Sequence, residues 1–527
     1  MSVHTFVWRF AMAEAKIMTT TSSFEKMREM GAILIDKTAL IYRMVSGEND
    51  AFFLSRPRRF GKSLLVSTLQ AYFEGRKELF DGLAMADLEK DWVKYPVFKF
   101  DMSNMKDASL ERLDESLDIM LKAYEAIYGC DSSAKLPSTR LQELIRRARV
   151  KTGLRAVVLI DEYDTPLLDS IMDEAALGTI RNKLRDFYGV LKQSTDDIRF
   201  AFITGITKFS QLSIFSAMSN LVSISMSNEY ASICGITKEE LLTALSKEVR
   251  NMAQTLNISE STALAKLKKK YDGYHFSKKS PDIYNPLSLL RSLKDCELNN
   301  YWYSTGTPTF LTKMIGNYSI RPEELDGFMA SEMDFDVSIE DAETPIAVLY
   351  QSGYVTIKKF DGYDYTLGFP NEEVRVSFIK GLAPYYTKKT ANENNSIIQR
   401  MMRSFRNHDI DAAMLLLRSF YSSIPYDAEK QDENHYKTIF YLIFVLATDY
   451  VVRTEERSAA GRCDALIETE DTIYLFEFKL DGTAEEALQQ IDDKGYAIQY
   501  EAGDKKVVKI GVNFEKDKRT IERWIVG

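Results

Sequence analysis

The chain has 527 residues, which at about 100–200 residues per domain leaves room for about three domains. A net charge of −9 excludes a strongly basic nucleic-acid coat protein, although a local basic groove stays compatible with it. Four widely spaced cysteines without a CxxC pair argue against a zinc site or a disulfide framework and favour a cytoplasmic location. No apolar run of about 18 residues is present, so neither a membrane span nor a membrane partner is expected.

The first half of the chain alternates between strand-like and helix-like segments. Residues 1–22 are expected to be a tail and residues 23–235 an α/β domain. Five short apolar segments predict strands, namely Ala51–Ser55, Val97–Met102, Ala156–Asp161, Arg199–Thr204 and Leu221–Met226. Helices are predicted between them, at Lys62–Glu74, Leu110–Tyr128 and Ala175–Gln193. This alternation predicts a parallel sheet with crossover helices.

The first predicted strand leads into a loop that ends Gly61-Lys62-Ser63, and a helix follows. In a P-loop, backbone N–H groups and a helix N-terminus surround phosphates, the lysine reaches the outer phosphates and the hydroxyl binds Mg²⁺. The full pattern has glycine where this chain has Arg56, so a chance Gly-Lys-Ser in a surface turn is the alternative. The three loop arginines either contact phosphates or pair with carboxylates, and both interpretations stay open. The predicted nucleotide-binding loop residues are Arg56, Pro57, Arg58, Arg59, Phe60, Gly61, Lys62, Ser63 and Leu64.

The third predicted strand ends in two carboxylates, Asp161 and Glu162. At the carboxyl edge of a parallel sheet, Asp161 would lie beside the P-loop and hold Mg²⁺ together with Ser63. Glu162 would polarise the attacking water. The alternative is a solvated acidic turn, but the order of the two motifs along the chain favours an ATP site. At the tip of the next strand, Thr204 is the expected γ-phosphate sensor, and Lys208 could contact phosphate or another subunit.

The second half of the chain predicts three further regions. Residues 236–327 have the pattern of a helical lid, and residues 328–430 that of a mixed and helical middle region with a hairpin turn at Asp361–Gly362. Residues 431–527 predict a last domain with a helix, three strands, an amphipathic helix, a strand and a terminal helix. Its predicted elements are Glu433–Ala447, Tyr450–Glu455, Arg462–Glu468, Thr472–Leu480, Ala484–Tyr500 and Val507–Phe514. The amphipathic helix would bury one face, made of Ala484, Ala487, Leu488, Ile491 and Ile498.

Two neighbouring strands of this last domain carry a second candidate site. Alternate residues of a strand share a face, so Glu477 and Lys479 would point to one side, where Asp464 can meet them. Two carboxylates that bind a divalent metal and a lysine that activates water suit phosphodiester hydrolysis. Glu433 could add a carboxylate and Gln490 a polar contact. The alternative is an ordinary salt bridge on an exposed strand face.

Several motifs together resemble a known family. Over about residues 22–240, with the lid to about residue 300, the chain resembles the bacterial AAA-ATPase-like family. The motifs that carry this resemblance are SRPRRFGKS, VVLIDEYDTPL, FITGITKFS, YDGYHFS and YNPLSLL. RCDALIETEDTIYLFEFKL resembles the PD-(D/E)XK nuclease-like domain over roughly residues 430–527, with Cys463 at the proline position of the PD motif. The resemblance implies P-loop roles for Lys62 and Ser63. It implies magnesium and water roles for Asp161 and Glu162, and nuclease roles for Asp464, Glu477 and Lys479.

The sequence and this resemblance together predict an α/β P-loop NTPase of the ASCE/AAA-like type, with parallel sheet order 5-1-4-3-2. A helical lid, a helical middle region and a C-terminal restriction-endonuclease-like α/β domain follow. The expected function is Mg-dependent ATP hydrolysis that regulates metal-dependent cleavage of nucleic acid, with DNA favoured over RNA. The expected cofactors are ATP and Mg²⁺, with Mn²⁺ as a substitute at the nuclease site, and ATP is expected to promote self-association. The alternatives are an ATP-dependent binding module that does not cleave, and an interaction protein with a slow ATP site.

Overall fold

The computed structural model describes most of the chain, with gaps. The described residues are 16–103, 105, 109–171, 173–208, 221–302, 322–338, 344–387, 391–422, 438–443, 451–458, 461–469, 471–480, 482–501, 503–515 and 520–527. The chain divides into two compact units, which are treated separately below. The first comprises Met1–Met314 and Gly327–Glu373, and the second Ile315–Asp326 and Val374–Gly527. Among the described helices, none combines the length and the apolar character that a bilayer-spanning segment requires.

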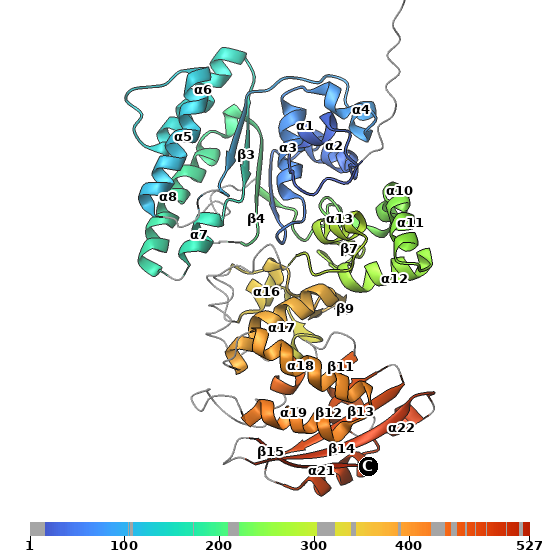
Figure 1. Ribbon diagram of the computed structural model, residues 1–527. Helices are drawn as coiled ribbons and strands as arrows, with labels where there is room; N and C mark the ends of the chain where they lie inside the picture. Colours follow the sequence, from blue (N-terminus) through green and yellow to red (C-terminus); the bar gives the residue numbers. More distant parts are fainter. Residues whose placement is uncertain are drawn as a thin grey trace, which may run out of the picture. The chain divides into compact units, whose positions relative to one another are not determined.

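A five-stranded parallel sheet forms the centre of the first unit (Figure 1). Its strands are β1 (Ala51–Ser55), β2 (Val97–Asp101), β3 (Ala156–Asp161), β4 (Ile198–Gly205) and β5 (Leu221–Ser223). Their order is β2-β3-β4-β1-β5, which confirms the predicted order 5-1-4-3-2. β5 is shorter than expected and ends at Ser223. The next donor of β1, the Ser55 N–H, bonds to the hydroxyl of Ser225 and not to a backbone carbonyl, so the strand pairing ends there.

Helices cover both faces of this sheet. Figure 1 shows α5, α6 and α8 on one side and α3, with α1 and α2, on the other. The β3 strand is buried along its whole length, as expected for a central parallel strand between two helical layers. The helices are α1 (Phe24–Glu29), α2 (Thr38–Ser46), α3 (Lys62–Phe73), α4 (Ala84–Leu88), α5 (Leu110–Tyr128), α6 (Pro137–Thr152), α7 (Thr165–Ser170) and α8 (Glu174–Gln193).

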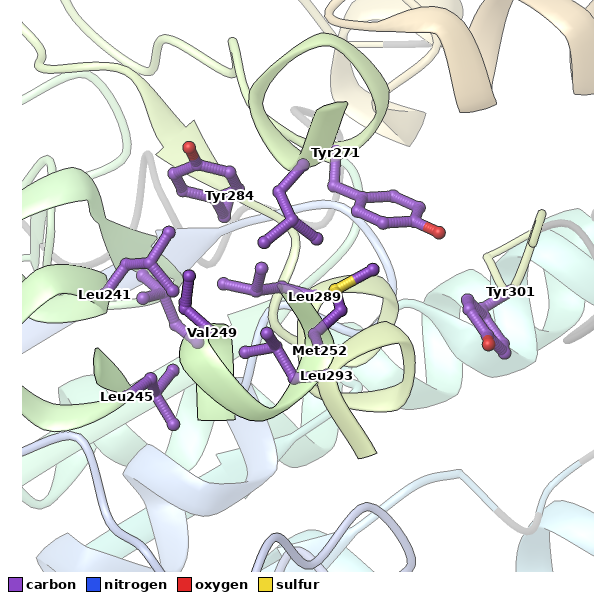
Figure 2. Packing of buried hydrophobic residues seen from close by; sticks show 11 residues of the cluster. Leu241, Leu245, Val249, Met252, Tyr271, Tyr284, Leu289, Leu293 and Tyr301 are labelled. Carbon is purple, nitrogen blue, oxygen red and sulfur yellow. The ribbon is translucent and has the colours of Figure 1, made fainter. Parts of the chain in front are cut away.

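A helical subdomain follows the sheet in the chain. Its elements are β6 (Ile236–Thr237), α10 (Lys238–Ala244), α11 (Ser246–Thr255), α12 (Glu260–Tyr271), β7 (Ile283–Tyr284) and α13 (Pro286–Asp295). Side chains such as Leu241, Met252 and Leu289 form its apolar core (Figure 2). Ile17, Ile33 and Ile35, which precede the sheet in the chain, pack against the same core.

The first unit ends in a small antiparallel sheet of order β8-β10-β9. Its elements are β8 (Phe328–Ala330), α15 (Glu332–Phe335), α16 (Ile346–Ser352), β9 (Thr356–Phe360) and β10 (Tyr365–Gly368). The predicted hairpin forms here, since Gly362 adopts φ 112° and Asp361 Oδ1 accepts the N–H groups of Tyr363 and Asp364.

The second unit has a five-stranded sheet of order β11-β12-β13-β14-β15. The strands are β11 (Val451–Ser458), β12 (Gly461–Glu468), β13 (Thr472–Lys479), β14 (Lys506–Glu515) and β15 (Thr520–Val526). Only the β13–β14 pair is parallel among these strands. The helices are α17 (Glu372–Thr387), α18 (Ala391–Arg406), α19 (Ile410–Ser422), α21 (Ala484–Asp493) and α22 (Ile498–Glu501).

Two sequence predictions for this unit were wrong. The terminal helix is the strand β15, which pairs antiparallel with β14. The predicted helix Ala484–Tyr500 divides into α21 and α22 because Gly495 takes the left-handed φ of 60°. Ile498 is therefore 67% exposed and does not extend the buried face of Ala484, Ala487 and Ile491.

Candidate active sites

The loop between β1 and α3 brings the predicted phosphate-binding residues together. Gly61 caps the N-terminus of α3 with φ 92°, a left-handed conformation that suits glycine, and Arg59 adopts φ 66°. Lys62 is buried, and its Nζ donates to the backbone carbonyls of Arg56 (2.9 Å) and Pro57 (3.1 Å). An ammonium group has three donors, so one more proton stays available for an anion in the loop.

Electrostatics at Lys62 follow from its surroundings. Burial lowers the pKa of its ammonium group, while the nearby carboxylates of Glu162, Asp161 and Asp164 oppose that shift. The neighbouring carboxylates favour the charged form of Lys62 despite its burial, and a charged ammonium group can bind phosphate oxygens.

Asp161, at the end of β3, lies next to the start of α3. Its carboxylate is 2% exposed and accepts a hydrogen bond from the Ser63 hydroxyl. Burial raises its pKa to about 6, against the lowering effects of Ser63 and Lys62. Within the described part of the chain, its Oδ1 is buried and has no hydrogen-bond partner. An orphaned carboxylate oxygen beside a hydroxyl is the donor set that Mg²⁺ prefers, so these residues fit a magnesium ion.

Glu162 follows directly in an uncommon backbone conformation, with φ 52°. The neighbouring Tyr163 N–H donates to the Thr204 carbonyl, and the Thr165 hydroxyl donates to Glu162 Oε2 at 3.3 Å. These bonds hold the turn, so Glu162 follows β3 directly at the carboxyl edge of the sheet.

Asp164 belongs to the same loop, and sequence reasoning did not single it out. Its fully buried Oδ2 accepts the N–H groups of Ile206 (3.0 Å) and Thr207 (2.7 Å) and the Thr207 hydroxyl (2.7 Å). An added Cβ at Gly205 would lie 2.4 Å from Asp164 Oδ1, so only glycine allows this close approach. The second aspartate of the DEYD motif was the available signal in the sequence.

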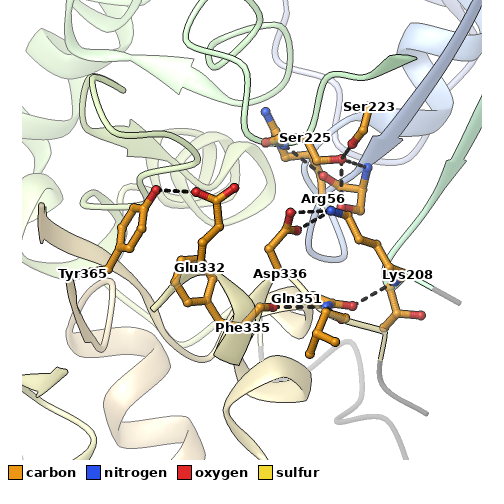
Figure 3. Close-up of polar contacts among 12 residues, drawn as sticks. Arg56, Lys208, Ser223, Ser225, Glu332, Phe335, Asp336, Gln351 and Tyr365 are labelled. Atoms are coloured by element: carbon orange, nitrogen blue, oxygen red, sulfur yellow. Dashed lines mark hydrogen bonds and ion pairs between the residues drawn. The ribbon is translucent and has the colours of Figure 1, made fainter. Parts of the chain in front are cut away.

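The side chains of Thr204 and Lys208 both bond to other groups of the protein. The Thr204 hydroxyl is fully buried and donates to the Leu54 carbonyl of β1 at 2.8 Å. Lys208 Nζ pairs with Asp336 at 2.5 Å, and its backbone N–H donates to Gln351 (Figure 3).

Arg56 occupies the first position of the loop and is 2% exposed. Its guanidinium donates to the carbonyl of Ser225 at 2.7 Å (Figure 3). It also donates to the carbonyl of Ser55 at 2.9 Å and lies 4.1 Å from the centre of the Phe276 ring. Burial lowers its pKa to about 10. These contacts of Arg56 are with carbonyls and an aromatic ring, and not with a carboxylate.

The remaining loop residues are held by packing and backbone contacts. Phe60 packs edge-on against Tyr274 and Phe276, with ring centres 4.7 and 5.2 Å away. The Arg58 carbonyl accepts from the Trp302 indole. Leu64 contributes its carbonyl to the Thr68 hydroxyl.

The second predicted site lies on β12, β13 and α21 of the second unit. Asp464 and Glu477 are buried, with exposed fractions of 9% and 2%. The Asp464 N–H donates to Glu477 Oε2, and Asp464 Oδ2 accepts the Phe478 N–H at 2.9 Å. Gln490 joins the other two groups, since it donates to Glu477 Oε1 and accepts from Lys479 Nζ at 2.5 Å. The structure thus brings together the three predicted residues and Gln490.

The donor atoms at this second site are hard carboxylate oxygens, which suit Mg²⁺ or Mn²⁺. Among the described residues, no group of three or more histidine, cysteine or acidic side chains gathers as a metal cluster, so the donor set here is two carboxylates. Cys463 is buried, and its thiol is within hydrogen-bond distance of the backbone carbonyls of Ala465 and Phe476. Glu433 lies outside the described residues.

The two units therefore define a P-loop nucleotide-binding domain and a small α/β domain with a buried Asp464–Glu477 pair beside the half-buried Lys479. A family model described as "Predicted AAA-ATPase" matches residues 19–215, and a model of the PD-(D/E)XK nuclease superfamily matches residues 431–524. An uncharacterised protein in the vnfD 5′ region of Azotobacter chroococcum mcd 1 is 32% identical over 529 residues, which cover 98% of this chain and 99% of that protein. The chain belongs to this family of predicted AAA-ATPases with a C-terminal PD-(D/E)XK nuclease-superfamily domain.

A solved structure is also similar, at a much lower level. The ORC2 protein of Aeropyrum pernix, in ADPNP–ADP complexes, is 12% identical, and the match covers 66% of this chain and 93% of that one. Its TM-score of 0.24 is too low to support an argument about function.

Proposed function

We propose that this protein hydrolyses ATP at the P-loop and that its nucleotide state regulates a C-terminal metal-dependent nuclease that acts on nucleic acid. The observation that supports it most is the convergence of Lys62, Ser63, Asp161 and Glu162 at one edge of the sheet. Lys62 would hold the outer phosphates, and Glu162 would orient the attacking water and take its proton. Magnesium, held by Ser63 and Asp161, would supply charge neutralisation on the phosphates.

In the second unit, Asp464, Glu477, Lys479 and Gln490 would form the nuclease site. Asp464 and Glu477 would hold Mg²⁺ or Mn²⁺, which supplies Lewis-acid stabilisation of the phosphate. Lys479, on the same strand face as Glu477, would orient the water that attacks phosphorus. Gln490 would hold the side chains of Lys479 and Glu477 in position, because its amide bonds to both.

A binding module that does not cleave is the second candidate. The hydrogen bonds among Asp464, Glu477, Lys479 and Gln490 already satisfy these groups within the protein, as in a rigid polar core. Cleavage would require that a bound metal take over part of these contacts.

The deciding experiment is a panel of single- and double-stranded DNA and RNA with Mg²⁺ or Mn²⁺, with and without ATP, on wild type and Lys479→Ala. Metal-dependent cleavage by wild type, lost in Lys479→Ala, supports the nuclease. Binding without cleavage by both proteins supports the binding module. Sedimentation of Glu162→Gln with ATP tests the further proposal that ATP promotes self-association, which a monomer in every nucleotide condition would contradict.

A further inference from the structure

The backbone of the P-loop is held from outside by a tryptophan far along the chain. The indole Nε1–H of Trp302 donates to the Arg58 carbonyl at 3.3 Å, across 244 residues of sequence. A peptide group is planar and trans, so the Arg58 carbonyl and the Arg59 N–H point in opposite directions. Trp302 therefore orients the Arg59 N–H, one of the backbone donors with which such a loop surrounds phosphates.

Trp302 is itself fixed by packing. Its side chain is buried, and its ring lies edge-on against Tyr354 with centres 4.9 Å apart. Gly353, the residue before Tyr354, ends α16. A Cβ added at Gly353 would lie 2.5 Å from the Cβ of Pro57. The backbone after α16 thus abuts the P-loop directly, next to the ring that supports Trp302.

The backbone N–H of Trp302 bonds to a residue at the start of another helix. Its backbone N–H donates to Glu373 Oε1 at 2.7 Å, and Glu373 is 1% exposed. Glu373 stands in the first turn of α17, and from Val374 onwards that helix belongs to the second unit. Trp302 therefore bonds to the P-loop with its side chain and to α17 with its backbone.

We propose that Trp302 is a positioning residue of the ATP site, which couples nucleotide binding to the order of the first turn of α17. This inference rests on the proposed ATPase function. Phosphates that bind the loop N–H groups immobilise the Arg58–Arg59 peptide, and this strengthens the indole hydrogen bond on its opposite side. Trp302 then becomes more rigid, and so does the carboxylate of Glu373 that holds its backbone.

The test uses Trp302→Phe in the full chain, because this change removes the indole N–H and keeps an aromatic ring and the backbone N–H. Trp92→Phe is the matched control, since the Trp92 Nε1 is buried without a partner among the described residues and lies on Tyr72 and Phe80. Calorimetry with Mg-ATPγS should show binding about three- to tenfold weaker in Trp302→Phe, the loss expected for one neutral hydrogen bond. Trp92→Phe should bind like wild type.

Hydrogen exchange at saturating Mg-ATPγS separates positioning from a general loss of stability. Wild type and Trp92→Phe should gain protection in the peptide that covers residues 372–376, and Trp302→Phe should not. An equal gain in Trp302→Phe overturns the inference alone, whereas no nucleotide binding by wild type overturns the proposed ATPase and the inference together. Should Trp302→Phe fail to fold, Glu373→Leu removes the same link at its other end and must abolish the gain in protection, and a retained gain contradicts the inference.

Discussion

Asp164 and Thr207 lie 43 residues apart and are joined by two hydrogen bonds of 2.7 Å, from the backbone N–H and the hydroxyl of Thr207 to one carboxylate oxygen. They tie the loop after β3 to the loop after β4. Both loops stand at the carboxyl edge of the sheet, where a P-loop protein carries its catalytic groups. The geometry of Glu162 therefore depends on a fully buried residue two positions further along the chain.

Asp164→Ala is expected to destabilise the first unit by about 3 kcal/mol, because it leaves three donors buried without an acceptor. Asp164→Asn keeps an acceptor oxygen and should retain most of the stability. Urea unfolding measures both. Asp173→Ala is the control, since it removes only an exposed helix cap at α8, worth about 1 kcal/mol. Equal costs for Asp164→Ala and Asp173→Ala would contradict the assignment.

Lys62→Ala should abolish tight Mg-ATP binding, because the backbone donors of the loop cannot neutralise the outer phosphates without its charge. Glu162→Gln should bind ATP with near-normal affinity and hydrolyse it at least about a hundredfold more slowly, the loss typical of a removed general base. Calorimetry and phosphate release measure the two effects. Lys77→Ala, an exposed lysine outside the loop, is the charge-matched control. Normal turnover by Glu162→Gln would remove Glu162 from the catalytic role.

Glu373 predicts a pH-dependent stability. Burial raises its pKa to about 7 in the folded protein, above the ordinary value of 4.5, so the folded state holds a proton that the unfolded state has released between these two values. The free energy of unfolding therefore gains from Glu373 at low pH and loses that gain as pH rises through 7. Glu373→Gln should be more stable than wild type at pH 8 by about 2–3 kcal/mol, a difference that shrinks toward pH 5.

Denaturation of both proteins at pH 5, 6, 7 and 8 checks this prediction. The difference between wild type and variant cancels the other titrating groups. A difference that grows as the pH falls would have the wrong sign and would show that Glu373 is ionised at lower pH than its burial indicates.

Gln490→Ala should lower metal-dependent cleavage at least about tenfold while the second unit stays folded. Its side chain holds Lys479 and Glu477 in one network, and loss of a group that orients metal ligands typically costs 10–100-fold. Gln489→Ala is the matched control, because this neighbouring amide is exposed and donates to the exposed Asp493 of the same helix. Initial cleavage rates measure the effect, and equal rates for the two variants would place Gln490 outside the site.

The sequence by itself determined the fold class and the positions of the parallel strands, and the order of these strands followed only with the family resemblance of its motifs. Short apolar segments that alternate with helical periodicity predict parallel strands joined by crossover helices, so local patterns sufficed for these elements. The motifs at Lys62, Asp161, Asp464 and Glu477 were also readable, since strand alternation and strand ends define where such side chains point. The end of the chain was misjudged, because pairing with β14, and not local propensity, makes residues 520–526 a strand.

Only the tertiary structure decided what supports these groups. Arg56 bonds to Ser225, and Trp302 bonds to Arg58, across separations of 169 and 244 residues. Such partners leave no periodicity or spacing in the sequence, because they depend on which distant backbone groups become buried together. A buried polar group must find a partner wherever packing places one, and that requirement is met in three dimensions and not along the chain.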